Sequence, residues 1–241
     1  MKKICILDYG LGNIKSLYNS LRKIGYYPEF YSEDTSNKFD IIFIPGVGSY
    51  SKASKLLLSP KFKNFINEAR KNSYLFGICL GMQILLSKGF ENGEHEGLDL
   101  INGEVKLIGN KNQKVILPFV GYHKISIVND KAKFLNQYNN QKFYFVHSYV
   151  ANPRNEKDIL SYTTYQKIKY CSSIAKGQII GTQFHPEKSG EIGLNFLKDF
   201  IKNCWKMNIT LITSNQSRHN YLINSLNKEC DKLFVIQEKK I

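Results

Sequence analysis

The sequence predicts a doubly wound α/β fold, in which a mostly parallel sheet is flanked by helices and joined by a smaller antiparallel portion. In the first half of the chain, short apolar runs that end at glycine or proline alternate with segments of helical periodicity. The second half carries shorter strand patterns separated by turn residues. A length of 241 residues with 42% apolar side chains is enough to bury a sizeable core.

The amino-terminal segment predicts a strand, a helix and a second strand. Lys3 to Leu7 is a short apolar run, and Asn13 can cap a following helix that ends near Gly25. Asp40 to Ile44 is a continuous apolar run that ends at Pro45. Such a run is typical of a strand that is buried on both faces of a parallel sheet.

The same order of elements then repeats. A helix is expected from about Phe62 to Lys71, followed by a buried strand from Ser73 to Ile78. Residues Cys79 to Leu86 resume helical order, and a closing helix is expected from about Ile192 to Lys202. Between these two helices we expect short strands at residues 115–117, 125–128, 143–146, 170–174 and 179–183.

Residues 1–205 are predicted to form one domain, and residues 206–241 are predicted to be a C-terminal extension. The extension has apolar strand patterns at 208–213 and 233–236, around a segment up to Asn227 that can form a helix capped by Ser214 or Asn215. These elements make up half of a further α/β unit. The extension can therefore be the remnant of a fused domain or an ordinary tail that docks on the main domain.

The net charge of +14 favours, at first, a protein that binds nucleic acid. However, only four of the 34 basic residues are arginine, the usual residue for bidentate recognition of bases and phosphates, and the lysines are scattered. We therefore expect no nucleic-acid partner. No apolar run approaches the roughly 18 to 20 residues that cross a bilayer, and Asp8 interrupts the first one, so we expect no membrane association, no secretory signal and a cytoplasmic location.

The cysteines argue against a disulfide framework and against a zinc site, because their number is odd and no C-x-x-C pair is present. One of them lies in a distinctive segment, Gly77-Ile78-Cys79-Leu80-Gly81, at the junction of a buried strand and a helix. Small flanking residues permit a sharp turn that exposes a nucleophile, and the helix N-terminus favours its thiolate. The N–H of Leu80 points to where an oxyanion would form. The other cysteines are predicted to be buried structural thiols: Cys5, Cys171, Cys204 and Cys230.

A thiolate nucleophile needs a base, and the base needs an acid that orients it. The segment Gln183-Phe184-His185-Pro186-Glu187 supplies both, because alternate residues of an extended segment, here His185 and Glu187, point to the same side. Pro186 stiffens the link between them. Cys79, His185 and Glu187 are therefore the predicted catalytic residues.

Residues 77–83 and 183–187 resemble the signature of the class I, or triad, glutamine amidotransferases. These enzymes hydrolyse glutamine to glutamate and ammonia through a cysteine thioester. Further segments resemble, in the same order, the HisH family, the glutaminase subunits of imidazole glycerol phosphate synthase: residues 8–14, 45–50, 93–98, 144–149 and 184–194. The resemblance covers residues 1 to about 203.

The resemblance implies a role for each matching residue. Cys79 attacks the glutamine amide, His185 shuttles the proton and Glu187 orients His185. The oxyanion hole is implied to consist of backbone N–H groups at three positions: Val47, Gly48 and Leu80. Four residues are implied to hold the glutamine: Gln83, Glu91, Ser148 and Tyr149. By residue type alone, Gln83 and Glu91 can also belong to an exposed helix face and a charged loop.

The resemblance also implies a heterodimer with a (β/α)8 synthase (cyclase) barrel, which uses the ammonia to make imidazole glycerol phosphate and AICAR in histidine biosynthesis. The family has a Pro-His-Met-Gly-Trp-Asn-like segment on the strand that faces the barrel. Here the segment is Pro118-Phe119-Val120-Gly121-Tyr122-His123. The alternative function is therefore that of a paralogous subunit that supplies ammonia for amidination of a sugar in bacterial surface-glycan biosynthesis.

Two other motifs do not match on inspection. Gly10 and Gly12 follow a strand, as in a dinucleotide-binding loop, but Lys15 occupies the position of the third glycine. His95 and Glu96 lack the second histidine of a zinc protease helix. We therefore expect no cofactor and no metal. A non-catalytic regulator on the same fold is disfavoured, because it would have no need of the three predicted catalytic residues.

Overall fold

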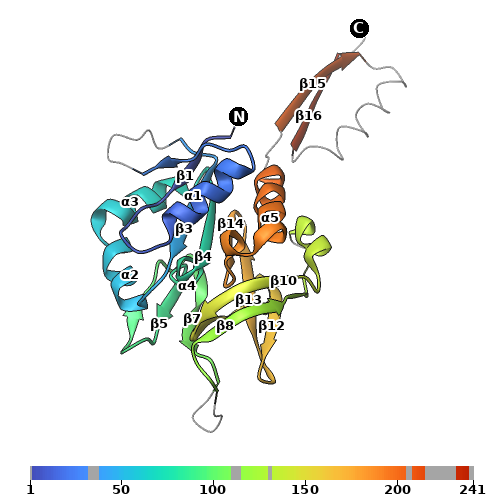
Figure 1. The fold of residues 1–241 in the computed structure, drawn as a ribbon. Coiled ribbons are helices and arrows are strands. Elements are labelled where there is room, and N and C mark those ends of the chain that lie inside the picture. Colours follow the sequence, from blue (N-terminus) through green and yellow to red (C-terminus); the bar gives the residue numbers. More distant parts are fainter. Residues whose placement is uncertain are drawn as a thin grey trace. The chain divides into compact units, whose positions relative to one another are not determined.

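The structure of the protein is a computed structural model (Figure 1). It describes residues 2–31, 38–109, 115–129 and 132–204, and the backbone alone of residues 208–214 and 232–238. The chain divides into two units, Met1–Ile201 and Lys202–Ile241. Within the part of the chain that the structure describes, no helix is long and apolar enough to cross a membrane.

The first unit is built on one large twisted sheet. In spatial order its strands are β2 (Glu29–Phe30), β1 (Ile4–Ile6), β3 (Ile41–Gly46), β4 (Tyr74–Cys79), β14 (Ile179–Thr182), β13 (Ile168–Lys176), β12 (Ile159–Tyr165) and β9 (Ser126–Ile127). Pairing is parallel from β2 to β14 and antiparallel from β14 to β9. The predicted fold class, a mostly parallel sheet with an antiparallel portion, is confirmed.

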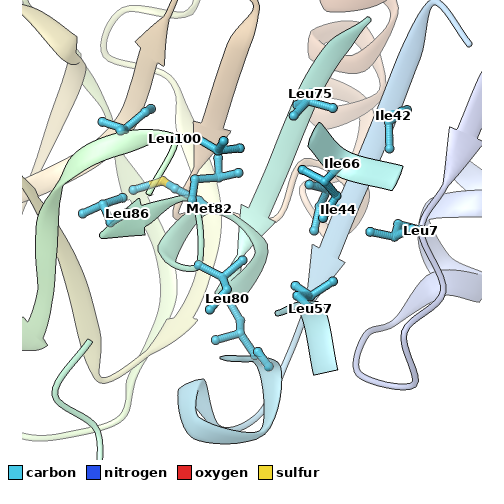
Figure 2. Packing of buried hydrophobic residues seen from close by; sticks show 14 of the residues in the cluster. Leu7, Ile42, Ile44, Leu57, Ile66, Leu75, Leu80, Met82, Leu86 and Leu100 are labelled. Carbon is cyan, nitrogen blue, oxygen red and sulfur yellow. The ribbon is translucent and has the colours of Figure 1, made fainter. Parts of the chain in front are cut away.

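Helices cover the sheet because its central strands are apolar on both faces. Ile44 of β3 packs in the same core as Leu57 and Ile66 (Figure 2), whereas the preceding residue, Phe43, contacts Phe200 on the other side. The helices are α1 (Ile14–Lys23), α2 (Tyr50–Leu57), α3 (Pro60–Ala69), α4 (Leu80–Gln83) and α5 (Gly190–Asn203), with 3-10 turns η1 (Lys133–Tyr138), η2 (Glu156–Asp158) and η3 (Pro186–Lys188). As predicted, the Asn13 side chain caps α1, accepting from the N–H of Ser16.

Two smaller sheets complete the first unit. One has the order β11 (Tyr149–Pro153), β7 (Ile101–Leu107), β5 (Leu86–Gly89) and β6 (His95–Glu96). The other is an antiparallel ribbon of β8 (Phe119–Lys124) and β10 (Lys142–His147). The ribbon reaches the end of the large sheet through an isolated bridge between Tyr144 and His185.

The prediction of one helix from Cys79 to Leu86 is wrong. Helix α4 ends at Gln83, and Leu86 begins strand β5, which pairs with β7. Residues Ile84, Leu85 and Leu86 are all fully buried. A run that is buried on every side has no periodicity to distinguish helix from strand.

The prediction of a strand at residues 115–117 is also wrong, because the strand β8 begins at Phe119. The N–H of Ile116 donates to the Gln166 side chain, and the carbonyl of Ile116 accepts from the Tyr165 hydroxyl. The backbone of Ile116 is therefore paired with side chains, and no strand ladder forms there.

In the second unit, β15 (Asn208–Ser214) and β16 (Lys232–Glu238) form a parallel pair. Both lie where the sequence predicts strands. The helix predicted up to Asn227 lies outside the described residues, apart from its alternative cap Ser214, which is the last residue of β15.

Candidate active site

Cys79 is the last residue of β4 and has φ 54° and ψ −110°. A non-glycine residue in this region is strained, at a cost of order 1–3 kcal/mol, and such residues cluster at functional sites. The turn is tight enough to require both flanking glycines. A Cβ at Gly77 would overlap the carbonyl oxygen of Gly81, and a Cβ at Gly81 would overlap the carbonyl oxygen of Ile44.

Cys79 and His185 meet because β4 and β14 are neighbouring parallel strands. Ile78 pairs with Thr182, so Cys79 and the segment that begins at Gln183 leave the sheet at the same edge. The carboxyl ends of parallel strands are where open α/β sheets place their ligands. Residues far apart in the sequence are therefore brought to one site by the topology of the sheet.

His185 is 1% exposed, and its Nδ1 lies 2.7 Å from Oε1 of Glu187. The carboxylate fixes a proton on Nδ1, which leaves the buried Nε2 to interact with Cys79. Burial alone would lower the pKa of His185. The charges of Cys79 and Glu187 outweigh it and raise that pKa well above its usual value. The environment of His185 therefore favours its protonated form.

The His185–Glu187 contact forms in a tighter backbone than the extended segment that the sequence predicts. His185 itself is extended, but Pro186 to Lys188 form the 3-10 turn η3. Ser189 closes this turn: its hydroxyl donates to the carbonyl of His185 at 2.6 Å and accepts from the N–H of Tyr144 at 3.0 Å. The two side chains thus meet through a rigid turn that is tied to strand β10.

A pocket of about 260 Å³ opens in front of Cys79. It is lined by the residues that the sequence predicts to hold substrate or oxyanion, Val47, Gly48, Leu80, Gln83, Glu91, Ser148 and Tyr149, and by Cys79, Pro118, Val146 and His147. His185 and Glu187 are not among the described lining residues. His185 belongs to the site through its interaction with Cys79, and Glu187 through its contact with His185.

The glycine loop next to Cys79 combines close approach with backbone freedom. Gly46 pairs directly with Cys79 in the β3–β4 register, and a Cβ there would lie 2.7 Å from the backbone nitrogen of Gly81. Gly48 has φ +108°, a conformation that favours glycine. The loop therefore lies against the turn that holds Cys79, and Val47 and Gly48 line the same pocket as Cys79.

Glu91 has a structural contact as well as a place in the pocket. One of its carboxylate oxygens accepts from the N–H of Tyr50, the first residue of α2, at 2.5 Å. A carboxylate is favourable at a helix N-terminus. Glu91 therefore lines the pocket and also contacts the first turn of α2.

Sequence reasoning gave no role to two buried polar residues of the site, Gln183 and His147. The Gln183 amide contacts the Cys79 sulfur at 3.5 Å. Nδ1 of His147 lies 3.1 Å from the carbonyl oxygen of Tyr149, which can only accept, so His147 is protonated on Nδ1. For Gln183 a signal existed: it lies two residues before His185, in the segment that supplies the predicted base and acid.

His147 makes the stability of the fold sensitive to acid. Burial is the main cause that lowers the pKa of His147 to about 3, from its usual 6.5. Between these pH values the unfolded chain binds a proton that the folded chain does not, so the free energy of unfolding falls as the pH falls below about 6.5. We expect His147→Gln to lose less stability than the natural protein between about pH 7.5 and pH 5. Urea unfolding at both pH values measures this, and equal losses would contradict it.

The other described cysteines are buried away from the pocket. Burial, with a smaller contribution from Glu29, raises the pKa of the Cys5 thiol to about 12. Burial also raises the pKa of Cys171, and Cys204 is buried. Thiols with such raised pKa values stay protonated and unreactive. Cys230 lies outside the described residues.

The structure combines an open α/β sheet with a cysteine, a buried His–Glu pair and a pocket at one edge of the sheet, and comparison with known proteins identifies the family. The family model of the class-I glutamine amidotransferases matches residues 5–204. The PurLQS structure from Thermotoga maritima has the same fold, with a TM-score of 0.66 and 17% identity over 85% of this chain and 100% of that one. The chain belongs to the class I glutamine amidotransferases, and within them to the HisH family.

The second assignment follows from relatives of higher identity. The imidazole glycerol phosphate synthase subunit HisH of Sulfolobus acidocaldarius is 40% identical over 199 residues, which cover 82% of this chain and 96% of the relative. The subunit of the same name from Lactococcus lactis is 38% identical over 206 residues, which cover 84% and 99%. The chain is thus a glutamine amidotransferase by descent.

Proposed function

We propose that the protein hydrolyses glutamine to glutamate and ammonia, with Cys79 as nucleophile, His185 as proton carrier and Glu187 as the acid that orients His185. The observation that carries this proposal is one arrangement: a cysteine on a strained strand end, beside a buried His–Glu pair 2.7 Å apart, facing a pocket. A nucleophile, a base and an orienting acid are the parts that acyl transfer requires.

In the first half of the reaction, the Cys79 thiolate attacks the side-chain amide carbon of glutamine. The negative charge that moves to the amide oxygen is held by N–H groups of Leu80 and of the Val47–Gly48 loop, each worth about 3 kcal/mol where such donors have been removed. His185, protonated on Nε2, gives that proton to the amide nitrogen. Ammonia leaves, and a γ-glutamyl thioester remains on Cys79.

In the second half, water attacks the thioester carbonyl while Nε2 of His185, now neutral, accepts its proton. The carbon–sulfur bond then breaks, glutamate leaves, and the thiolate with protonated His185 is restored. Gln83, Glu91, Ser148 and Tyr149 line the pocket and are the residues that we propose to hold the glutamine. Glu91 offers a carboxylate that suits the α-amino group of the substrate.

We further propose that the ammonia passes to a (β/α)8 synthase barrel, in a heterodimer that works in the cytoplasm. Ammonia is mostly protonated at pH 7, and only the unprotonated form is a nucleophile, so a closed path to a partner is needed. The HisH relatives are named as subunits of imidazole glycerol phosphate synthase, which supports that barrel as the partner.

An apolar surface beside the pocket supports a docking site for the barrel. Ile116, Val120 and Tyr122 are 74%, 54% and 53% exposed, and Pro118 between them lines the pocket. The Tyr122 hydroxyl donates to the carbonyl of Lys188 at 3.0 Å, which links this surface to the turn that holds Glu187. A partner seated here would cover the mouth of the pocket and touch the strand that supports the triad.

The departure of residues 118–123 from the family pattern has two different consequences. Phe119 is fully buried against Phe145 and Tyr165, so its side chain belongs to the core of the ribbon. Val120 and Tyr122 are exposed, so their identities would alter the docking surface itself. The change at these exposed residues supports the alternative function, in which the ammonia is used for amidination of a sugar in surface-glycan biosynthesis.

Val120→Asp is expected to abolish stimulation by the barrel and to leave the basal release of glutamate unchanged. The side chain is exposed in the free subunit, so a carboxylate costs little there, but it would be buried without a partner in the complex. Titration of glutaminase activity with the barrel measures the effect. If Val120→Asp were stimulated like the natural protein, the docking surface would lie elsewhere.

The test of the whole proposal is glutamate release by the purified protein, alone and with the histidine-pathway barrel and an analogue of its nucleotide substrate. Strong stimulation is expected. Absence of stimulation, with Cys79 still reactive towards a glutamine-like alkylating agent, would contradict the histidine-pathway barrel as partner and favour the sugar pathway. Absence of both activity and reactivity would contradict the glutaminase itself.

A further inference from the structure

Gln183 is fully buried at the base of the active site, and the reaction proposed above gives it no role. Its side-chain nitrogen lies 3.5 Å from the sulfur of Cys79. We propose that Gln183 stabilises the Cys79 thiolate by donating an N–H to its sulfur. This inference rests on the proposed function, since it assigns a second support to the same nucleophile.

The orientation of the Gln183 amide follows from its neighbours. Gln83 Nε2 lies 2.8 Å from the carbonyl oxygen of Tyr149, and a carbonyl oxygen can only accept, so this end of Gln83 is the NH2 group. The same nitrogen donates to Oε1 of Gln183 at 3.1 Å. With its oxygen turned to Gln83, Gln183 presents its own NH2 group to Cys79. The carbonyl oxygen of Tyr149 therefore fixes the orientation of both amides, that of Gln83 and that of Gln183.

The backbone holds Gln183 in place. It directly follows Thr182, whose register partner across the parallel β14–β4 pair is Ile78, the residue before Cys79. The N–H of Gln183 donates to the carbonyl of Ser172 at 2.9 Å. Because its side chain has no exposed surface, it cannot swing into solvent, and its contact with the sulfur is built into the sheet.

The other surroundings of the sulfur explain why such a donor matters. The carbonyl of Val146, 3.8 Å from the sulfur, can only accept and therefore favours the protonated thiol. Helix α4 has a single turn, so the dipole that a longer helix would offer is small. Beside His185, which also interacts with the sulfur, the Gln183 amide is a second side-chain donor to it among the described residues.

The experiment is the pH dependence of Cys79 alkylation by iodoacetamide, followed at the Cys79 peptide by mass spectrometry. In Gln183→Met, which keeps the length of the side chain and has no N–H, the half-maximal rate is expected about one pH unit higher than in the natural protein. A shift of this size is expected for loss of a hydrogen bond to a charged acceptor. The kcat for glutamine should fall more than KM rises, since Gln183 is not among the described residues of the pocket wall.

Thr182→Val is the matched control. It removes one buried hydrogen bond, from the Thr182 hydroxyl to the carbonyl of Phe184 at 3.0 Å, on the residue next to Gln183. It leaves the sulfur untouched, so its pH profile should match that of the natural protein. A Gln183→Met profile that coincides with that of Thr182→Val would overturn the proposal, because Gln183 would then be structural only.

Two outcomes separate this inference from the proposed function. If the natural protein hydrolyses glutamine but Gln183→Met leaves the pH profile unchanged, the glutaminase stands and the role of Gln183 falls. If the profile shifts but no glutamine is hydrolysed with or without the barrel, Gln183 supports a thiolate of another function. Should Gln183→Met not fold, Gln183→Asn withdraws the amide from the sulfur by one methylene and is expected to shift the profile in the same direction.

Discussion

Cys79→Ala is expected to lower glutamine hydrolysis by at least about 10⁴-fold, since loss of a nucleophile removes the whole covalent route. Alanine keeps the Cβ, and Cys79 is 5% exposed beside an open pocket, so the fold should persist. Glutamate release, measured alone and with the barrel, checks the prediction. A variant that folds and turns over within tenfold of the natural protein would refute Cys79 as the nucleophile.

Cys171→Ala is the matched control for that experiment. Cys171 is a buried cysteine of the same large sheet, and its thiol donates to the carbonyl of Ser173 at 3.5 Å. Loss of this hydrogen bond should lower the free energy of unfolding by about 1 kcal/mol and leave catalysis intact. Equal losses of activity in Cys171→Ala and Cys79→Ala would mean that the assay reports folding, and the assignment of Cys79 would fail.

Gly81→Ala is expected to cost both the activity and a large part of the stability. The added Cβ would overlap the carbonyl oxygen of Ile44 on the neighbouring strand β3. The register of β3 and β4, which pairs Ile44 with Gly77, prevents a simple retreat of that carbonyl. We expect the free energy of unfolding to fall by more than about 3 kcal/mol, at the upper end for an overpacked core.

Urea unfolding measures the change, and Gly12→Ala serves as its comparison. A Cβ at Gly12 would come no closer than 3.3 Å to the carbonyl oxygen of Pro45, so a small shift accommodates it. We expect Gly12→Ala to stay within about 1 kcal/mol of the natural protein. If Gly81→Ala were as stable and as active as Gly12→Ala, the tight turn around Cys79 would not need its glycine.

The central sheet could be predicted from the sequence because its strands carry their own signal. The run Ile41–Ile44 is apolar without interruption, and the structure buries both of its faces. The strand ends could also be predicted, since Cys79 lies between two glycines that leave no space for a Cβ. The local structure of a residue can thus be predicted from the sequence where its sequence neighbours determine its geometry.

The rest depended on contacts between distant segments. Leu86 is buried whether it lies in a helix or a strand, and its pairing with Ile101 decides for the strand β5. Ile116 is kept out of a strand by the side chains of Tyr165 and Gln166. No local pattern in the sequence encodes these partners.

Within the site, charge and reactivity guided the prediction towards Cys79, His185 and Glu187. The amide of Gln183 and the neutral imidazole of His147 have no charge that a motif would flag. Their importance comes from burial and from single acceptors, the carbonyl of Tyr149 above all, that fix their orientation. The structure was needed to bring these groups to the sulfur and the pocket.

The measurement that tests the central claim most directly is a rapid acid quench of the protein with radiolabelled glutamine, with and without the barrel, followed by peptide mapping. The account predicts a γ-glutamyl label on the peptide that contains Cys79, which hydroxylamine releases as the hydroxamate. Glutamate formation without any label on that peptide, or with the label on another residue, would contradict a thioester on Cys79.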